Sequence, residues 1–402
     1  MLNENHVLPA DFLEETGGGA RDIPCPEQLT PSASLDQILL FARMEKASDV
    51  HLCTGAPVMF RLNGSFKVML EGRLTGDQVA AMLQKTIPAA KWAEAKRTGD
   101  LEFVYVIPGG GRFRMVITRQ REGWDMAARL IDTDIRSFEE CGMPASCLGL
   151  TKWAQGLVLV AGPAGCGKTS TLATLIEHVN KERDEHIITI ESPIEVVYTP
   201  KKAQITQRGI GTHTLSPANA LRAALREDPD IIVVSELRDL EMIQLAVSAA
   251  ETGHLVFGTM NTNDASQTVT SLINSFSPDE QPIVRNMVAE SLRGVICQQL
   301  IPRKDGKGLV AAFEVLIVTS AVSALIKSGR SRQLNNVIAT GKSSGMVLLD
   351  YSMMDMVNKG VISGQDALRR AIDPKMFAQY ATPAAPVAPA APARPTQGVP
   401  YA

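Results

Sequence analysis

The 402-residue sequence is long enough to form at least two hydrophobic cores, and its 45% hydrophobic and 21% charged residues exclude wholesale disorder. Lysine and arginine total 40 against 43 aspartates and glutamates, so the chain lacks the basic footprint expected of a nucleic-acid translocase. The six cysteines form no C-x-x-C pair, a pattern that fits neither a zinc knuckle nor a secreted disulfide framework and favours reduced thiols in a cytosolic protein. No apolar run approaches the roughly 18 residues of a membrane span, so we expect any membrane contact to be indirect.

The first region of the chain predicts a flexible leader followed by a small α+β domain. Residues 1–33 contain a run of three glycines and show little periodicity, which is typical of a flexible leader. Ser34 and Gln37 then form the pattern of a capping box at the start of a helix. Further helices are predicted over 78–85 and 89–96. Short strands are predicted over 58–62, 66–70, 101–106, 113–118 and 127–131. We assign this domain to residues 34–140.

The second region predicts an α/β domain with a parallel sheet. After a linker at 141–152, apolar runs at 156–161, 186–190, 231–234 and 254–259 alternate with helical stretches. Strands that are apolar throughout and separated by helices indicate a parallel sheet covered on both faces. We assign this domain to residues 153–376 and expect the chain past about residue 268 to be mostly helical. The Pro/Ala-rich tail at 377–402 is predicted to be disordered.

A phosphate-binding loop is the most specific motif in the sequence. Residues 162–169 read GPAGCGKT and match G-x-x-x-x-G-K-[ST] directly between an apolar run and a helix-like stretch. Glycines let backbone N–H groups turn toward the phosphates, and the helix N-terminus adds partial positive charge. Lys168 is expected to contact the β- and γ-phosphates of ATP, and the Thr169 hydroxyl to bind Mg²⁺. The predicted nucleotide-binding residues are Gly162, Pro163, Ala164, Gly165, Cys166, Gly167, Lys168, Thr169 and Ser170.

Acidic residues follow two of the predicted strands. Glu236 ends the run that begins at Asp230, and Glu191 and Glu195 follow the strand at 186–190. Because a parallel sheet places its ligands at the carboxyl ends of its strands, we expect Glu236 to face the phosphate loop. There it would polarise the attacking water or hold a water on Mg²⁺. Spacing alone does not choose between Glu191 and Glu195 for a similar role.

These motifs resemble those of a known family. Residues from about 35 to 375 resemble the type IV pilus retraction ATPases (the PilT and PilU group) of the type II/IV secretion ATPase superfamily. The resemblance is strongest over 156–176, 188–195, 221–239 and 249–262, which occur in family order and at family spacing. It implies a PAS-like N-terminal domain joined to a RecA-like P-loop ATPase domain. It also implies a hexameric ring, with ATP between the two domains.

The resemblance also assigns roles to individual residues. It makes Glu236 the Walker B acid that acts with Mg²⁺, and Glu195 the key carboxylate of a second acidic box. His254 matches the first histidine of a histidine box. The remaining matches are N-terminal-domain arginines, some of which reach the nucleotide in the family: Arg112, Arg114 and Arg129.

Three positions depart from the family pattern. Ser192 stands where the family usually has Asp, and Asn261 replaces the second histidine of the histidine box, so that no proton transfer is available there. Residues 321–328 (AVSALIKS) stand where the family has a motif linked with retraction. These departures leave nucleotide binding intact and bear on hydrolysis and on retraction.

The sequence therefore predicts a hexameric ATP-hydrolysing motor that retracts type IV pili and drives twitching motility. Its expected partners are five further copies of the chain, an inner-membrane pilus platform protein and a paralogous ATPase, without nucleic acid. The expected location is the cytoplasm, with recruitment to the inner face of the cytoplasmic membrane. Two alternatives stay open: an accessory or regulatory ring subunit that binds ATP and hydrolyses it weakly, and a secretion-system ATPase.

Overall fold

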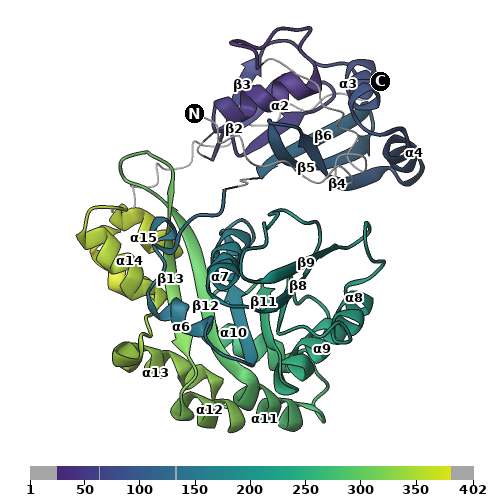
Figure 1. Ribbon diagram of the computed structural model, residues 1–402. Coiled ribbons are helices and arrows are strands. Elements are labelled where there is room, and N and C mark those ends of the chain that lie inside the picture. The colour runs from purple at the N-terminus through teal and green to yellow at the C-terminus, as the bar shows by residue number, and fades with distance from the viewer. Residues whose placement is uncertain (1–24, 63, 132–133, 382–402) are drawn as a thin grey trace, which may run out of the picture.

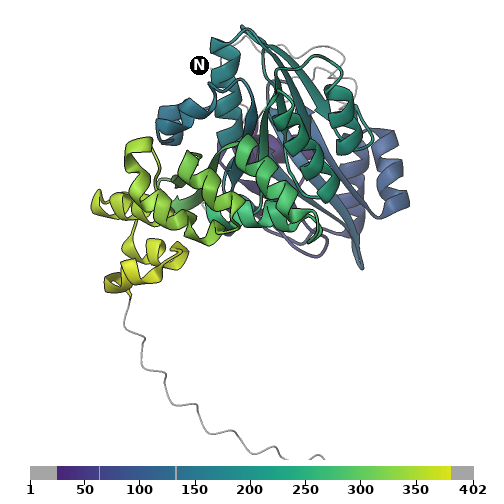
Figure 2. The same cartoon turned by 90° about the horizontal axis from the view of Figure 1, so that it is seen from below.

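The computed structural model describes residues 25–62, 64–131 and 134–381, which form two units that each have a sheet of their own (Figure 1). The first unit lies above the second in Figure 1. In the view from below, the helices of the second unit lie in front of much of the first (Figure 2). Most of the predicted leader (residues 1–24) and of the predicted tail (residues 382–402) falls outside the described residues.

In the described residues, the first unit is a six-stranded antiparallel sheet with three helices, as the α+β prediction requires. Its strand order is β3-β2-β1-β6-β5-β4. The strands are β1 (Asp49–Leu52), β2 (Val58–Leu62), β3 (Ser65–Leu70), β4 (Asp100–Ile107), β5 (Gly111–Gln120) and β6 (Gly123–Ile131). The helices are α2 (Leu35–Met44), α3 (Gly76–Thr86) and α4 (Ala89–Thr98). The predicted capping box at Ser34 and Gln37 is present at the start of α2.

Strand β5 presents different residues on its two faces. Phe113, Met115 and Ile117 are fully buried in the core of the first unit. Because neighbouring residues of a strand point to opposite faces, Arg112 and Arg114 lie on the other face. The sequence alternation therefore places two arginines on the side of the sheet away from its own core.

The second unit is a seven-stranded mixed sheet in the order β13-β12-β7-β11-β10-β8-β9. The neighbouring strands from β12 to β9 pair in parallel, and β13 pairs with β12 antiparallel. The strands are β7 (Gly156–Ala161), β8 (His186–Glu191), β9 (Gln204–Gly209), β10 (Ile231–Val234), β11 (Leu255–Met260), β12 (Leu292–Pro302) and β13 (Leu309–Ile317).

The expectation that the chain past residue 268 is mostly helical is wrong for β12 and β13. Both strands are apolar over most of their length and buried. A short apolar run looks the same in a buried strand as in a buried helix, so periodicity alone does not separate the two. Pairing with β7 decides the conformation of β12, and β12 in turn provides the partner for β13.

Helices cover both faces of this sheet. Leu157, Leu159 and Ala161 of β7 pack against α8 to α13, and the alternate residues Val158 and Val160 pack against α5 to α7. The first set of helices is α8 (Pro217–Ala224), α9 (Leu240–Glu251), α10 (Ala265–Asn274), α11 (Gln281–Ser291), α12 (Ser320–Lys327) and α13 (Leu334–Thr340). The second set is α5 (Phe138–Cys141), α6 (Ser146–Leu150) and α7 (Lys168–Glu182). A strand that is apolar at every position thus buries both of its sides, as predicted.

The C-terminal helices form a small cluster beside β12 and β13. They are α14 (Leu349–Asn358), α15 (Gly364–Arg370) and the 3-10 helix η3 (Pro374–Tyr380); two further 3-10 turns, η1 (Ser331–Gln333) and η2 (Gly341–Ser344), flank α13. Phe377 is fully buried in this cluster. Helix η3 therefore includes a core residue beyond residue 376, where we predicted that the domain ends. Among the described residues, no helix has both the length and the apolar character needed to cross a membrane.

Candidate functional site

The loop between β7 and α7 has the geometry of a phosphate-binding site. Strand β7 ends at Ala161, and α7 begins at Lys168 directly after Gly167, whose φ of 92° lies in the left-handed region. No side chain caps the N-terminus of α7, and its first turn has no acidic residue. The partial positive charge of the helix N-terminus is therefore available to an anion.

Gln298 on β12 holds the phosphate loop in place through hydrogen bonds. Its Nε2 donates to the carbonyl oxygen of Cys166 at 2.8 Å, and its Oε1 accepts a hydrogen bond from the Thr171 hydroxyl. The packing is so close that a Cβ on Gly162 would lie 2.4 Å from both the Cys166 sulfur and the Gln298 carbonyl oxygen. Gln298 is not among the predicted site residues, because nothing in the motif marks the strand that carries it.

Cys166 is buried in this packing, and burial raises the pKa of its thiol. A raised pKa leaves little thiolate at neutral pH. The residue therefore acts as a small side chain inside the loop.

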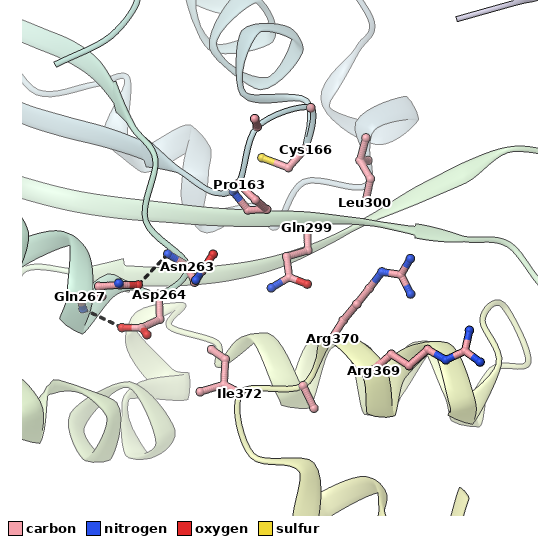
Figure 3. A pocket seen from close by; sticks show the side chains of 13 residues that line it. Pro163, Cys166, Asn263, Asp264, Gln267, Gln299, Leu300, Arg369, Arg370 and Ile372 are labelled. Atoms are coloured by element: carbon pink, nitrogen blue, oxygen red, sulfur yellow. Dashed lines mark hydrogen bonds between the residues drawn. The ribbon is translucent and has the colours of Figure 1, made fainter. Parts of the chain in front are cut away.

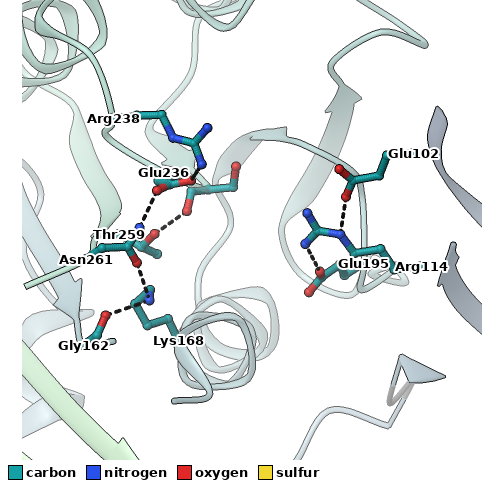
Figure 4. A network of polar contacts seen from close by, with 10 residues as sticks. Glu102, Arg114, Gly162, Lys168, Glu195, Glu236, Arg238, Thr259 and Asn261 are labelled. Carbon is teal, nitrogen blue, oxygen red and sulfur yellow. Dashed lines mark hydrogen bonds and ion pairs between the residues drawn. The ribbon is translucent and has the colours of Figure 1, made fainter. Parts of the chain in front are cut away.

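A chain of polar contacts joins the phosphate loop to the ends of β10 and β11 (Figure 4). Lys168 Nζ donates to the carbonyl oxygens of Gly162 at 2.8 Å and Pro163 at 3.1 Å, and to Asn261 Oδ1 at 2.8 Å. Asn261 Nδ2 in turn donates to Glu236 Oε1 at 2.6 Å. The neutral amide of Asn261 thus lies between the loop cation and the carboxylate, with each end bonded to the group it suits.

Arg238 extends this chain on the far side of Glu236. Its Nη2 lies 2.9 Å from Glu236 Oε2, and the arginine is exposed. Arg238 is not among the predicted site residues. Its position two residues after the acid at a strand end is the signal that was available.

The two carboxylates after β8 differ in their surroundings. Glu191 accepts hydrogen bonds from Thr189 Oγ1 at 2.6 Å and Gln207 Nε2 at 3.0 Å, and burial raises the pKa of its carboxyl. Glu195 lies beyond Pro193 and pairs with Arg114 at 3.2 Å. Glu191 is therefore held within the second unit, and Glu195 faces the first unit.

Two arginines of β5 bind the segment that carries Glu195. Arg112 Nη2 donates to the carbonyl oxygen of Ile194, and Arg114 contacts both Glu195 and Glu102. Burial is the largest influence on Arg112 and lowers the pKa of its guanidinium, although Glu191 and Glu195 lie near enough to oppose that shift. Figure 4 shows the Arg114 contacts as a network separate from the one at Lys168.

Comparison with known proteins agrees with these features. The family model described as type II/IV secretion system protein matches residues 29–369. The chain is 40% identical to the type IV pilus retraction ATPase PilT of Pseudomonas aeruginosa over 85% of this chain and 99% of that protein. It is also 40% identical to a twitching motility protein of Neisseria gonorrhoeae, over 78% of this chain and 84% of the relative. A crystal structure of the pilus retraction motor PilT with bound ADP superposes with a TM-score of 0.77 and 36% identity, covering 87% of this chain and all of that one.

The chain belongs to the type II/IV secretion ATPase family. Within that family it is a retraction ATPase of the pilus type, which confirms the predicted resemblance and the two-domain P-loop architecture. Its activity is ATP hydrolysis, and its substrate is a nucleotide.

Two of the residues that the family resemblance suggested lie away from the phosphate loop of the chain. His254 precedes β11, at the opposite end of that strand from Asn261, and its Nδ1 lies 3.0 Å from the carbonyl oxygen of Ala249. Arg129 pairs with Asp49 at 2.8 Å inside the first unit. Neither residue is brought to Lys168 or Glu236 within one copy of the retraction ATPase.

The residues at the edge of the sheet fit ATP with Mg²⁺. Thr169 is exposed in the first turn of α7, and Glu236 is partly buried at the end of β10. In the described part of the chain, no group of three or more His, Cys, Asp or Glu residues forms a metal-binding cluster. A hydroxyl and a carboxylate suit Mg²⁺, which keeps several waters and takes its other ligands from phosphate oxygens.

Proposed function

We propose that this chain is the motor subunit that retracts a type IV pilus, working as a ring of six copies driven by ATP hydrolysis. The observation that carries this proposal is the contact chain from Lys168 through Asn261 to Glu236, in a chain related over most of its length to pilus retraction ATPases. Such a chain joins the lysine expected to bind phosphate to the carboxylate that would act with Mg²⁺.

In this proposal Lys168 exchanges partners when ATP binds. Its Nζ leaves the two carbonyl oxygens and Asn261 and moves to the β- and γ-phosphate oxygens. Thr169 and Glu236 would hold Mg²⁺, which when bound neutralises charge that develops on the phosphate oxygens. Asn261 would then donate from Nδ2 toward the γ-phosphate side and keep Glu236 oriented.

The acidic box supplies the second part of the mechanism. Glu195 is partly exposed, and in this proposal it accepts a proton from the attacking water, whereas Glu191 is held by Thr189 and Gln207. Glu195 is paired with Arg114, so the pair must separate before the carboxylate acts on water. We propose that this separation links movement of the first unit against the second to the hydrolysis step.

The proposed partners follow from the same motor role. We propose a homo-hexamer that docks on an inner-membrane pilus platform protein, with a paralogous ATPase as a further partner. The working location would be the cytoplasmic face of the inner membrane, with membrane contact made through the platform protein. A net charge of −3 favours protein partners over nucleic acid.

A second candidate is an accessory ring subunit that binds ATP and hydrolyses it weakly. Asn261 favours it, because an amide between Lys168 and Glu236 holds no transferable proton. Ser192 favours it as well, because the acidic box has one carboxylate fewer than the resemblance implies.

Complementation separates the two candidates. In cells deleted for this chain, the motor predicts that wild type restores twitching and that Glu236→Gln does not, at equal protein levels. The accessory role predicts that Glu236→Gln restores twitching as well as wild type does. Lys168→Ala serves as the control that removes nucleotide binding in both cases.

A further inference from the structure

A cavity of about 350 Å³ lies among the helices of the second unit. Its lining comes from three segments: Thr270, Ile273 and Asn274 of α10, Arg285 of α11, and residues 329–333 after α12. A larger cavity, of about 540 Å³, adjoins residues 163–166 of the phosphate loop and shares no lining residue with the smaller one (Figure 3). Helices α11, α12 and α13 lie at the lower edge of the second unit in Figure 1, away from the first unit. The smaller cavity is therefore separate from the nucleotide site.

The turn after α12 forms one wall of the smaller cavity. Gly329 ends the helix with a φ of 70°, in the left-handed region that favours glycine. The hydroxyl of Ser266 on α10 donates to the carbonyl oxygen of Ser331 at 2.9 Å and holds the turn against α10. Arg330 and Arg332, which flank Ser331, are thereby kept at the cavity.

Arg285 reaches the same turn from α11. A Cβ added to Gly329 would lie 3.6 Å from Arg285 Nε and 3.7 Å from Arg285 Cζ, so the guanidinium packs on the turn. Its Nη2 donates to Gln281 Oε1 at 3.3 Å, and Arg330 Nε donates to Ser328 Oγ at 3.0 Å. Both acceptors are neutral, so these hydrogen bonds leave the positive charges uncompensated.

The lining has an excess of positive charge. Within the described part of the chain, Arg285, Arg330 and Arg332 form no ion pair with a carboxylate. Glu290, the acidic residue of α11, pairs instead with Lys327 at 2.9 Å. The C-terminal end of α10 adds only about half a negative charge. Three like charges around one cavity repel one another, and a bound anion would relieve that repulsion.

Phosphate is the anion that this lining fits best. A phosphate group carries up to about two negative charges near neutral pH and several acceptor oxygens, whereas a carboxylate carries one charge. Guanidinium groups bind phosphate oxygens in pairs through their planar forks of N–H donors. The side chains of Thr270, Asn274 and Gln333 add neutral donors to the lining. The volume lies within the range of about 300–1,000 Å³ of small-molecule sites, so it accommodates a free phosphate ion or a small phosphate ester.

We propose that the smaller cavity is an anion site that takes the phosphate group of a small molecule, bound by Arg285, Arg330 and Arg332. The bound phosphate would join α10, α11 and the turn after α12 through one set of charges. The site lies at the C-terminal end of α10, and the N-terminal end of that helix follows Asn261 of the phosphate-loop network. Binding at this site does not depend on the motor role of the chain.

Calorimetry with inorganic phosphate and phenyl phosphate tests the proposal on full-length protein. All chains carry Lys168→Ala, which removes the phosphate-binding lysine of the loop. Thr270→Asp adds a carboxylate to the lining and should weaken both probes at least about 10-fold, whereas the matched Thr270→Asn should stay within about 2-fold. Arg332→Gln should weaken them about 10-fold. Its control is Arg303→Gln, at an arginine paired with Asp305 outside the cavity, which should stay within about 2-fold.

The two sets of variants keep the proposal testable if one of them fails to fold. Arg332 is exposed, so Arg332→Gln disturbs no packing even if Thr270→Asp unfolds the chain. Absence of binding by both probes, or equal binding to Arg332→Gln and to Arg303→Gln, overturns the phosphate site. Binding of a glutamate-rich peptide without binding of either phosphate probe also overturns it and indicates an acidic protein segment as the ligand. Tighter binding of inorganic phosphate supports a free ion as the ligand, and tighter binding of phenyl phosphate supports a phosphate ester.

Discussion

Glu314 provides a sharp test of the packing behind the nucleotide site. It lies on β13, is 1% exposed, and accepts hydrogen bonds from the backbone N–H of Ala265 at 2.7 Å and of Leu349 at 3.2 Å. The carboxylate therefore joins the first residues of α10 and α14. Burial raises the pKa of Glu314 to about 7; the two N–H donors oppose this shift, and Asp264 and Asp350 add to it.

The sign of the pH effect follows from this raised pKa. The folded chain holds the Glu314 proton more tightly than the unfolded chain does. The stabilisation of the folded chain by this proton is therefore complete below the ordinary glutamate pKa of 4.5 and is lost as the pH rises through about 7. For these two values, linkage gives a loss of about 2 kcal/mol between about pH 5.5 and about pH 7.5. Glu314→Gln should remove this loss.

Urea unfolding of wild type and Glu314→Gln at both pH values measures the difference. The glutamine side chain has one acceptor oxygen for the two backbone N–H groups, which lowers the stability by about 1–3 kcal/mol. That cost is the same at both pH values. The matched control is Glu290→Gln, an exposed glutamate paired with Lys327. If the free-energy difference between wild type and Glu314→Gln is equal at the two pH values, the account of Glu314 as a buried carboxyl with a raised pKa is refuted.

The other predictions concern single residues of the site. Arg114→Gln should raise the basal ATPase rate about 2-fold, because a partly exposed ion pair that restrains Glu195 contributes about 0.5 kcal/mol; an unchanged or lower rate in steady-state assays argues against the restraint. Asn261→His should give the ATPase rate a pH dependence with an apparent pKa near the imidazole value of about 6.5, a step that a wild-type pH–rate profile should lack. Cys166 should react with iodoacetamide much more slowly than the exposed Cys25 at neutral pH, since burial raises the pKa of its thiol; equal labelling in peptide mapping contradicts that.

The sequence predicts local features well where chemistry and spacing agree. The phosphate loop, the strand that precedes it and the helix that follows lie where the glycine motif requires them. The strand runs at 156–161 and 231–234 agree with β7 and β10, because four to six apolar residues between turn signals are too short for a helix.

The sequence does not predict contacts that depend on pairing between distant segments. Strand β12 owes its conformation to pairing with β7, more than a hundred residues earlier in the chain, and β13 pairs with β12 in turn. Strand β1 is not among the predicted strands, because it is only four residues long. Gln298 carries no local signal, since a single glutamine has the same pattern on any surface. The different surroundings of Glu191 and Glu195 likewise depend on how the two units meet, because Glu195 pairs with Arg114 of the first unit.

Steady-state ATP hydrolysis by purified full-length protein decides whether this chain works as a motor. The assay compares wild type with Glu236→Gln, Asn261→His and Lys168→Ala, and nucleotide binding is measured in parallel. A motor predicts turnover by wild type, binding without turnover by Glu236→Gln, and neither by Lys168→Ala. Turnover by Glu236→Gln at the wild-type rate, or a silent wild type that gains activity with Asn261→His, would contradict it.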